Sequence, residues 1–276
     1  MLHRSNSGPD LLVHRWSAVG EPWASVLIVH GLAEHGGRYE RTGGLLADAG
    51  LAVEAVDLRG AGGSAGRRAH VERFSDYLDD VEWRLAVIRE AAAGRPVILL
   101  GHSLGGLVCL DYATSRRPLP DLLILSSPAI ASTIPSWKKA LARTFDSVAP
   151  TVRVANGVSG DQLSRDPAVG EAYFGDPLVE VSSTFRLGAE SFRVQDRVRR
   201  SSGRLSIPTF VTHGEADPIV PVASSEYLAA LPGVTRTVYP GLRHETLNEP
   251  EGPALVADML AWLRAQVGDP GTGGAR

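Results

Sequence analysis

Residues 97–111, which read VILLGHSLGGLVCLD, restrict the possible folds of this chain more than any other stretch. Four apolar residues, 97–100, lead into Gly-His-Ser-Leu-Gly at 101–105, and a segment with helical character follows over 106–113. A short continuous apolar run is typical of a strand buried on both faces. Gly-x-Ser-x-Gly between such a strand and a helix is typical of a nucleophile elbow, which holds its serine on a tight, strained turn. We therefore predict that Ser103 is a nucleophile, the alternative being a glycine-rich loop that only packs a helix on a sheet.

Size and composition fit one soluble globular domain with room for an inserted subdomain. The chain has 276 residues, of which 43% are hydrophobic and 21% are charged. A formal net charge of −3 gives no basic surface for nucleic acid, so nucleic acid is not an expected partner. The single cysteine, Cys109, excludes an intramolecular disulfide, and its position behind the elbow predicts a small buried hydrophobe.

Neither an export signal nor a membrane span is predicted. Residues 1–10 lack the apolar core of a signal peptide, and no apolar run approaches the roughly 20 residues that cross a bilayer. We therefore expect a cytoplasmic protein. Residues 268–276, GDPGTGGAR, contain nothing to bury, and we expect a disordered tail there.

Buried strands and amphipathic helices alternate along most of the chain. Strands are predicted at 11–19, 25–30, 51–56, 97–100, 122–125, 207–213 and 234–239, and helices at 38–49, 74–93, 106–113, 222–231 and 253–267. This alternation predicts an α/β fold with a mostly parallel central sheet covered by helices on both faces. It stops over 128–203, where helical patterns with Pro and Gly replace buried strands. We expect a helical insertion there, between two parts of one core at 1–127 and 204–267.

Two loops late in the chain can supply the base and the orienting acid that a serine nucleophile requires. They are residues 214–218 and 240–245, and each follows a predicted strand, where the functional groups of open α/β sheets stand. The resulting order of Ser103, Asp217 and His244 is the serine, acid, histidine order of α/β-hydrolases. We assign His244 as general base and then general acid, and Asp217 as the group that orients its ring.

Other candidates for these two roles are less well placed. His102 precedes the serine and should point away from it, and His213 ends a strand instead of standing on a loop. Three other histidines lie in poor positions for a shared site: His3, His14 and His70. Glu215 competes as the acid, but Asp217 lies further along the loop. The alternative for His244 is a histidine on a surface loop.

Two backbone N–H groups are expected to bind the oxyanion. One belongs to Leu104, directly after the nucleophile, and the other to the loop after strand 25–30, where Leu32 is the best-placed residue. His30 either is a core histidine in a tight turn or braces this loop by hydrogen bonding. We also include His30 among the expected substrate contacts.

No pattern indicates a metal or a cofactor. The pair His244-Glu245 lacks the second histidine, four residues after the first, of a zinc-binding His-Glu-x-x-His helix. The glycine-rich turn near Gly60 lacks the lysine and the spacing of a phosphate-binding loop. We therefore expect neither a metal ion nor a nucleotide.

Further motifs resemble the monoacylglycerol lipase group of α/β-hydrolases, also described as lysophospholipase-like. The matching stretches are HGLAEHGGRYE at 30–40, DLRG at 57–60, FSDY at 74–77, the elbow, LSRDP at 163–167, DPLV at 176–179, HGEAD at 213–217, HE at 244–245 and NE at 248–249. The resemblance covers most of the chain and implies the same triad and oxyanion donors, no cofactor, and monoacylglycerols or related single-chain lipid esters as substrates. One departure is Ala61, where relatives usually carry a histidine.

By the same resemblance, the insertion at 128–203 is a cap. Apolar residues recur there at three- and four-residue steps and place one stripe along a helix: Ile130, Ile134, Trp137, Leu141, Phe145 and Val148. The stripe either packs on the core or belongs to a lid whose apolar face guides an acyl chain or touches a lipid surface. Four of its members are expected substrate contacts: Ile134, Trp137, Leu141 and Phe145.

The sequence thus predicts a serine carboxylic ester hydrolase that releases glycerol and a fatty acid from monoacylglycerols through an acyl-enzyme. A lysophospholipase or a broad-specificity carboxylesterase is the nearest alternative, and an acyltransferase would differ only in excluding water. A peptidase would need an acidic anchor for a substrate amine, and we identify none. From a different class, the chain could be a ligand-binding relative without turnover. The oligomeric state is left open.

Overall fold

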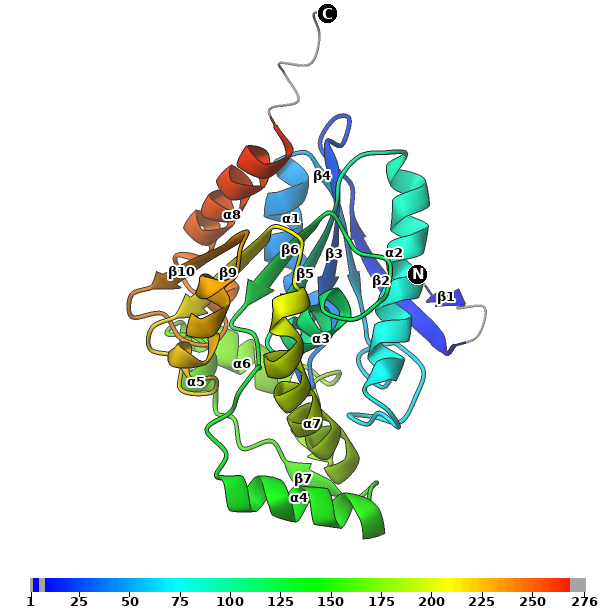
Figure 1. The fold of residues 1–276 in the computed structure, drawn as a ribbon, viewed down its shortest axis with the longest axis vertical. Helices are drawn as coiled ribbons and strands as arrows, with labels where there is room; N and C mark the ends of the chain where they lie inside the picture. Colours follow the sequence, from blue (N-terminus) through cyan, green and yellow to red (C-terminus); the bar gives the residue numbers. More distant parts are fainter. Residues whose placement is uncertain (1, 5–7, 269–276) are drawn as a thin grey trace, which may run out of the picture.

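An eight-stranded sheet organises the protein (Figure 1). The computed structural model describes residues 2–4 and 8–268, so the expected disordered tail lies outside the described residues except for Gly268. The strands are β1 Leu2–Arg4, β2 Asp10–Trp16, β3 Ala24–Val29, β4 Leu51–Val56, β5 Val97–His102, β6 Leu122–Ser126, β9 Thr209–Gly214 and β10 Val234–Tyr239. Their order in the sheet is β1-β2-β4-β3-β5-β6-β9-β10. The pairs β1–β2 and β2–β4 are antiparallel, and every other pair of neighbouring strands is parallel.

Helices cover both faces of this sheet, as predicted. The α-helices of the core are α1 Glu40–Asp48, α2 Ser75–Ala92, α3 Leu104–Ala113 and α8 Gly252–Val267, and its 3-10 helices are η1 Gly36–Tyr39, η3 Val222–Ala230 and η4 Thr246–Asn248. One face is covered by α1 and α8, and the other by α2 and α3 (Figure 1). The predicted α/β class with a mostly parallel sheet is therefore confirmed.

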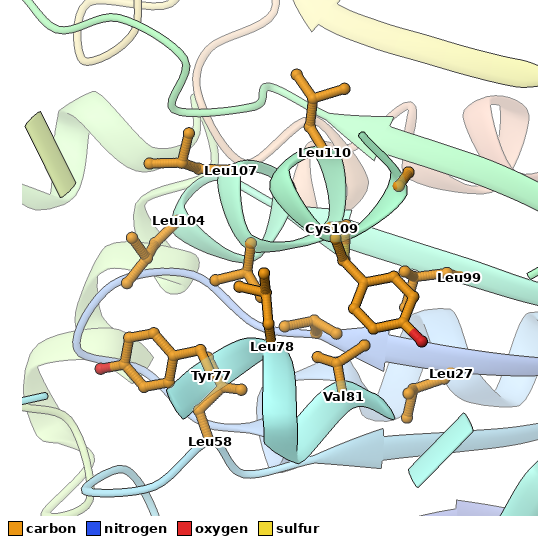
Figure 2. Packing of buried hydrophobic residues seen from close by; sticks show 14 of the residues in the cluster. Leu27, Leu58, Tyr77, Leu78, Val81, Leu99, Leu104, Leu107, Cys109 and Leu110 are labelled. Atoms are coloured by element: carbon orange, nitrogen blue, oxygen red, sulfur yellow. The ribbon is translucent and has the colours of Figure 1, made fainter. Parts of the chain in front are cut away.

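Side chains of the central strands alternate between two hydrophobic layers. Along β3, Leu27 and Val29 join the layer of α2 and α3, whereas Val26 and Ile28 join the layer of α1 and α8. All six residues of β3 are buried, which explains why its sequence is continuously apolar instead of alternating. Figure 2 shows the first layer, where Cys109 of α3 packs among aliphatic side chains as a buried, free thiol.

The turn between β5 and α3 has strained backbone geometry. Ser103 has φ 51° and ψ −116°, a conformation that residues with a side chain rarely adopt. Glycine is required on both sides, since a Cβ on Gly101 would lie 2.4 Å from the Gly105 carbonyl oxygen. A Cβ on Gly105 would lie 2.1 Å from the Val29 carbonyl oxygen. Gly101 therefore lets α3 pack closely on β5, and Gly105 lets α3 pack against β3.

Replacement of Gly105 by alanine should destabilise the protein by about 3 kcal/mol, because the new Cβ would meet a backbone oxygen that cannot move without shifting β3. Gly44 in α1 is the matched control, since nothing lies within 4 Å of its Cβ position. Gly44→Ala should be neutral or should stabilise the protein by up to about 1 kcal/mol. Urea unfolding measures both variants, and equal midpoints for the two would contradict the packing argument.

Between β6 and β9 the chain forms a segment of its own, residues 128–203, called the cap segment below. Its elements are α4 Ser136–Val148, β7 Arg153–Ala155, α5 Gly160–Leu163, α6 Pro167–Gly175, β8 Ser182–Thr184, α7 Phe185–Ser201 and the start of η2 Ser202–Arg204. The sequence analysis expects only helices here, whereas β7 and β8 pair as a small antiparallel sheet. Strands of three residues are too short to show an alternating pattern. In Figure 1, α4 lies at the far end of the molecule from the sheet, and α7 leads back to the core.

Two further differences from the sequence analysis concern the core. The antiparallel strand β1 is not predicted, and the helix expected at 222–231 is the 3-10 helix η3. The other core elements differ from their predicted bounds by a few residues at their ends. Within the described part of the chain, none of the helices combines the length and the apolar character needed to cross a bilayer.

Candidate active site

The three side chains predicted to act together are joined by hydrogen bonds. Ser103 Oγ donates to His244 Nε2 at 2.9 Å, and His244 Nδ1 donates to Asp217 Oδ2 at 2.8 Å. They follow β5, β10 and β9, so each stands past the carboxyl end of a parallel strand. All three residues are largely buried. This geometry lets the imidazole take the hydroxyl proton while the carboxylate holds the ring.

The acid is held in its ionised form. Asp217 Oδ1 accepts hydrogen bonds from the backbone N–H groups of Ile219 and Val220, at 2.9 Å each. Its Oδ2 accepts from His244 and lies 3.3 Å from His213 Nε2. Burial alone would raise the pKa of Asp217, but hydrogen bonds from His213 and His244 lower it below its ordinary value. The competing acid, Glu215, is exposed and accepts instead from a backbone N–H of the neighbouring loop.

His213 is a neighbour of the acid that the sequence analysis misses. Its ring is fully buried, with Nδ1 bonded to Ser225 Oγ and Nε2 to the Val220 carbonyl, both at 3.1 Å. Its contact is with Asp217, whereas His244 is the histidine bonded to Ser103. The signal that could have revealed this contact is its spacing, four residues before the acid at the end of a strand.

His102, next to the serine, turns toward β6. Its Nδ1 lies 3.1 Å from the Ser126 carbonyl oxygen, and its ring centroid lies 4.9 Å from that of His244. Burial, with a smaller contribution from His244, lowers the pKa of His102 to about 4. His102 is therefore neutral near pH 7 and adds no positive charge beside the histidine of the triad.

Leu32 and Leu104, the two predicted oxyanion donors, line one small cavity together. Leu104 is the first residue of α3, so its N–H has no partner within the helix. Leu32 lies in the loop after β3, which passes close to the serine: a Cβ on Gly31 would lie 3.3 Å from Ser103 Cβ. The cavity has a volume of about 20 Å³, room for about one water molecule, and Ala61 also lines it.

His30 braces the loop that carries Leu32. Its Nδ1 donates to the Gly31 carbonyl at 2.8 Å, and its Nε2 accepts from the Leu58 N–H at 2.9 Å. The residue is 2% exposed, so neither ring nitrogen is left for the substrate contact that the sequence analysis expects. The Gly31 C=O and the Leu32 N–H belong to one trans peptide and point in opposite directions. His30 therefore fixes the direction of the Leu32 N–H.

Comparison with known proteins places this geometry in a family. The family model described as serine aminopeptidase, S33, matches residues 20–251, most of the chain. The chain belongs to this family. The prediction of a serine hydrolase is therefore confirmed at the level of the family.

Relatives of this family member include lipases. A monoacylglycerol lipase of Mycolicibacterium smegmatis is 32% identical over 262 residues, which cover 93% of this chain and 93% of that protein. A phospholipase of Bacillus subtilis is 30% identical and covers 86% of this chain and 93% of its own length. The crystal structure of Paleococcus ferrophilus monoacylglycerol lipase superposes with a TM-score of 0.84 at 31% identity, covering 93% of this chain and 99% of that one. The resemblance to the monoacylglycerol lipase group and the α/β-hydrolase fold are thereby confirmed.

In this serine hydrolase, the predicted apolar stripe lies on the exposed side of α4 and the loop before it. Trp137 is 64% exposed, and the other exposed members are Ile134, Leu141, Phe145 and Val148. Only Ile130, which precedes the helix, is buried. The alternative in which the stripe packs down on the core therefore does not describe α4. The four members expected to contact substrate are exposed in this structure.

Charged side chains on the opposite side of α4 hold it to α7. Asp146, the one buried residue of α4, accepts hydrogen bonds from Arg193 at 2.8 Å and from Arg186. Arg143 pairs with Asp196 at 2.8 Å. Because the polar side of α4 is used for packing, its apolar side faces outward.

One group of side chains has the residue types of a metal site. His14, His35 and Asp57 bring potential ligand atoms within 4.8 Å of one another. Asp57 Oδ1 already accepts from His14 Nε2 at 2.9 Å and from a backbone N–H at 2.7 Å. His35 accepts from a backbone N–H with Nδ1 and bonds Asp176 with Nε2 at 2.8 Å. Hydrogen bonds within the protein thus account for this group.

Proposed function

We propose that this protein is a serine carboxylic ester hydrolase that cleaves monoacylglycerols into glycerol and a free fatty acid. The observation that carries the proposal is the hydrogen-bonded chain that runs from Ser103, on a strained elbow, through His244 to Asp217. The family description names an aminopeptidase, whereas the relatives described above carry the names of lipases and a phospholipase. Those names support an ester substrate.

The proposed reaction passes through an acyl-enzyme. His244 Nε2 takes the Oγ proton as Ser103 attacks the ester carbonyl, and Asp217 stabilises the imidazolium. The N–H groups of Leu32 and Leu104 bind the tetrahedral oxyanion. The imidazolium then returns its proton to the glycerol oxygen as the carbon–oxygen bond breaks. Water, deprotonated by His244, attacks the acyl-enzyme, releases the fatty acid and restores the serine hydroxyl.

A substrate panel tests this proposal. It contains 1- and 2-monoacylglycerols, lysophosphatidylcholine, short p-nitrophenyl esters and an aminoacyl p-nitroanilide, assayed with the wild type and with Ser103→Ala. We expect the highest kcat/KM on monoacylglycerols. Preference for lysophosphatidylcholine would favour a lysophospholipase, the nearest alternative from the sequence; the Bacillus subtilis relative is named a phospholipase. Activity confined to short esters would contradict the proposal that lipid esters are the substrates. Cleavage of the anilide would indicate a peptidase instead of an ester hydrolase.

We also propose that the exposed stripe on α4 contacts the lipid surface that presents the substrate. Burial of large apolar side chains in a membrane interface is favourable, and basic residues beside them favour anionic lipids. Trp137 is the most exposed aromatic residue on the stripe, with Lys138 Nζ lying 5.5 Å from its ring centroid. Lys138 is thus a basic residue beside the stripe, whereas Arg143 pairs with Asp196 on the opposite side of α4.

Replacement of both Trp137 and Phe145 by serine should lower activity on emulsified long-chain monoacylglycerols by about 10- to 100-fold. Each lost apolar contact is worth about 1.5–3 kcal/mol when the side chain is fully buried. Hydrolysis of a soluble p-nitrophenyl ester should stay within twofold. Trp137→Ser alone serves as a check, because Phe145 also stacks on Phe185 at 5.1 Å. Val19→Ser, a change at an exposed residue outside the cap segment, is the control. Unchanged activity on the long-chain ester would remove the proposed contact.

A further inference from the structure

A buried arginine joins the loop that carries Leu32 to the loop that carries His244. Arg38 donates from Nη1 and Nη2 to the two carboxylate oxygens of Glu245, at 2.8 Å each. Its Nη1 also contacts the carboxylate of Glu34. The three charged side chains are each at most 9% exposed. Arg38, Glu34 and Glu245 are called the Arg38 cluster below.

Each carboxylate of the cluster is linked to a residue that neighbours a group of the proposed reaction. Glu34 Oε1 accepts from the Gly31 N–H at 2.5 Å, and Gly31 directly precedes Leu32. Glu245 directly follows His244, and its own N–H donates to a carbonyl of the cap segment at 2.8 Å. A continuous path of hydrogen bonds therefore connects the oxyanion loop to the histidine loop.

The charges in the Arg38 cluster depend on one another. Burial alone would raise the pKa of Glu34, but Arg38 lowers it well below its ordinary value. Burial also opposes ionisation of Arg38, whereas Glu34 and Glu245 raise its pKa. Such a buried ion cluster is a poor source of stability, because the cost of desolvating the charges offsets their attraction. What it supplies here is a fixed geometry between two loops.

We propose that Arg38 and Glu245 are positioning residues that set the Leu32 N–H relative to His244 and Ser103. The oxyanion donor and the proton-transfer group must act on the same tetrahedral intermediate, and a misplacement of about 1 Å can cost about 100-fold in rate. This inference rests on the proposed function. In this proposal, the Arg38 guanidinium holds the two loops in a fixed position relative to each other.

Arg38 acts through other residues and not on the substrate. Its hydrogen bonds go to the carboxylates of Glu34 and Glu245, and its guanidinium carbon lies 4.7 Å from the ring centroid of Tyr173. Glu34 is covered in turn by the Tyr39 hydroxyl, which donates to Oε1 at 2.9 Å. Loss of the cluster should therefore lower kcat and leave KM nearly unchanged.

Glu245→Gln, with Glu54→Gln as a matched control, tests the proposal. Glu54 forms a similar two-point pair with Arg84, between β4 and α2, away from the triad. Both substitutions keep the size of the side chain and remove one charge from a largely buried pair. Four quantities are measured: kcat and KM on p-nitrophenyl butyrate, the affinity for a trifluoromethyl ketone that forms a tetrahedral adduct with the serine, and the thermal midpoint.

We expect Glu245→Gln to lower kcat by 10- to 100-fold with KM within twofold of the wild type. Affinity for the ketone should weaken by the same factor as kcat/KM. Glu54→Gln should lower the thermal midpoint to a similar extent and leave kcat within twofold. Equal kcat in the two variants, or a rise in KM in place of the fall in kcat, would overturn the positioning role.

Arg38→Lys provides a second variant, because it keeps the charge but cannot form the two-point contact with Glu245. If Glu245→Gln does not fold, Arg38→Lys is judged by the same criteria.

Fluorophosphonate labelling of the wild type separates the two proposals. An unlabelled wild type that hydrolyses no ester would overturn the proposed function. A labelled, active wild type that matches Glu245→Gln in kcat would overturn the positioning role alone.

Discussion

Replacement of Ser103 by alanine should lower kcat for ester hydrolysis by about 10⁶ and leave the protein folded. In the proposed reaction, the serine Oγ is the atom that bonds to the substrate carbon, and this hydroxyl lies 2.9 Å from His244 Nε2. Without it, no acyl-enzyme forms, and hydrolysis depends on the residual effect of the oxyanion donors on attack by water. Turnover of p-nitrophenyl butyrate and fluorophosphonate labelling measure the loss.

Ser127→Ala is the matched control for this change. Ser127 follows β6, the strand beside β5, and like Ser103 it has a positive φ, of 42°. Its Oγ is buried and has no hydrogen-bond partner among the described residues. Ser127→Ala should therefore keep kcat within twofold. A comparable loss of kcat in both variants would show that Ser103→Ala acts by disturbing the backbone at this edge of the sheet and not by removing the nucleophile.

The core could be predicted from the sequence because its strands are buried on both faces. Runs such as Val26 to Val29 stay apolar only in the centre of a covered sheet, and the strand–helix alternation then leaves few arrangements. The short strands β1, β7 and β8 were missed because three residues cannot display a period. The orientation of α4 does not follow from the sequence for a different reason. Periodicity identifies an apolar side of the helix, but only the pairing of Asp146 with α7 decides which side faces outward.

The candidate site was predictable where it depends on strand ends and unpredictable where it depends on loop contacts. Ser103, Asp217 and His244 each follow a parallel strand, so the topology alone brings them to one edge. The contact of His213 with the acid and the bridge from Arg38 to Glu245 join side chains whose meeting depends on the path of each loop. No sequence period encodes that path.

Replacement of Asp217 by asparagine should lower kcat by about 10⁴. The hydrogen bonds around the side chain explain why an almost isosteric change is so severe. Oδ1 accepts two backbone N–H groups, from Ile219 and Val220, so in the variant this position must hold the amide oxygen. The amide NH₂ must then occupy the Oδ2 position and donate to His244 Nδ1. This forces the proton of His244 onto Nε2, which can no longer accept the proton of Ser103.

Glu215→Gln distinguishes this account from a general loss of negative charge on the same loop. Glu215 contacts a backbone N–H and not the histidine, so its variant should keep kcat within twofold. Because the pKa of Asp217 is lowered, the carboxylate stays ionised well below pH 7, and acidifying the wild type to pH 5 should not reproduce the loss through this group. A full loss in Glu215→Gln with activity retained in Asp217→Asn would show that the other carboxylate of the loop orients the histidine. Equal losses in both variants would instead implicate the conformation of the loop, since Asp217 contacts His244 and Glu215 does not.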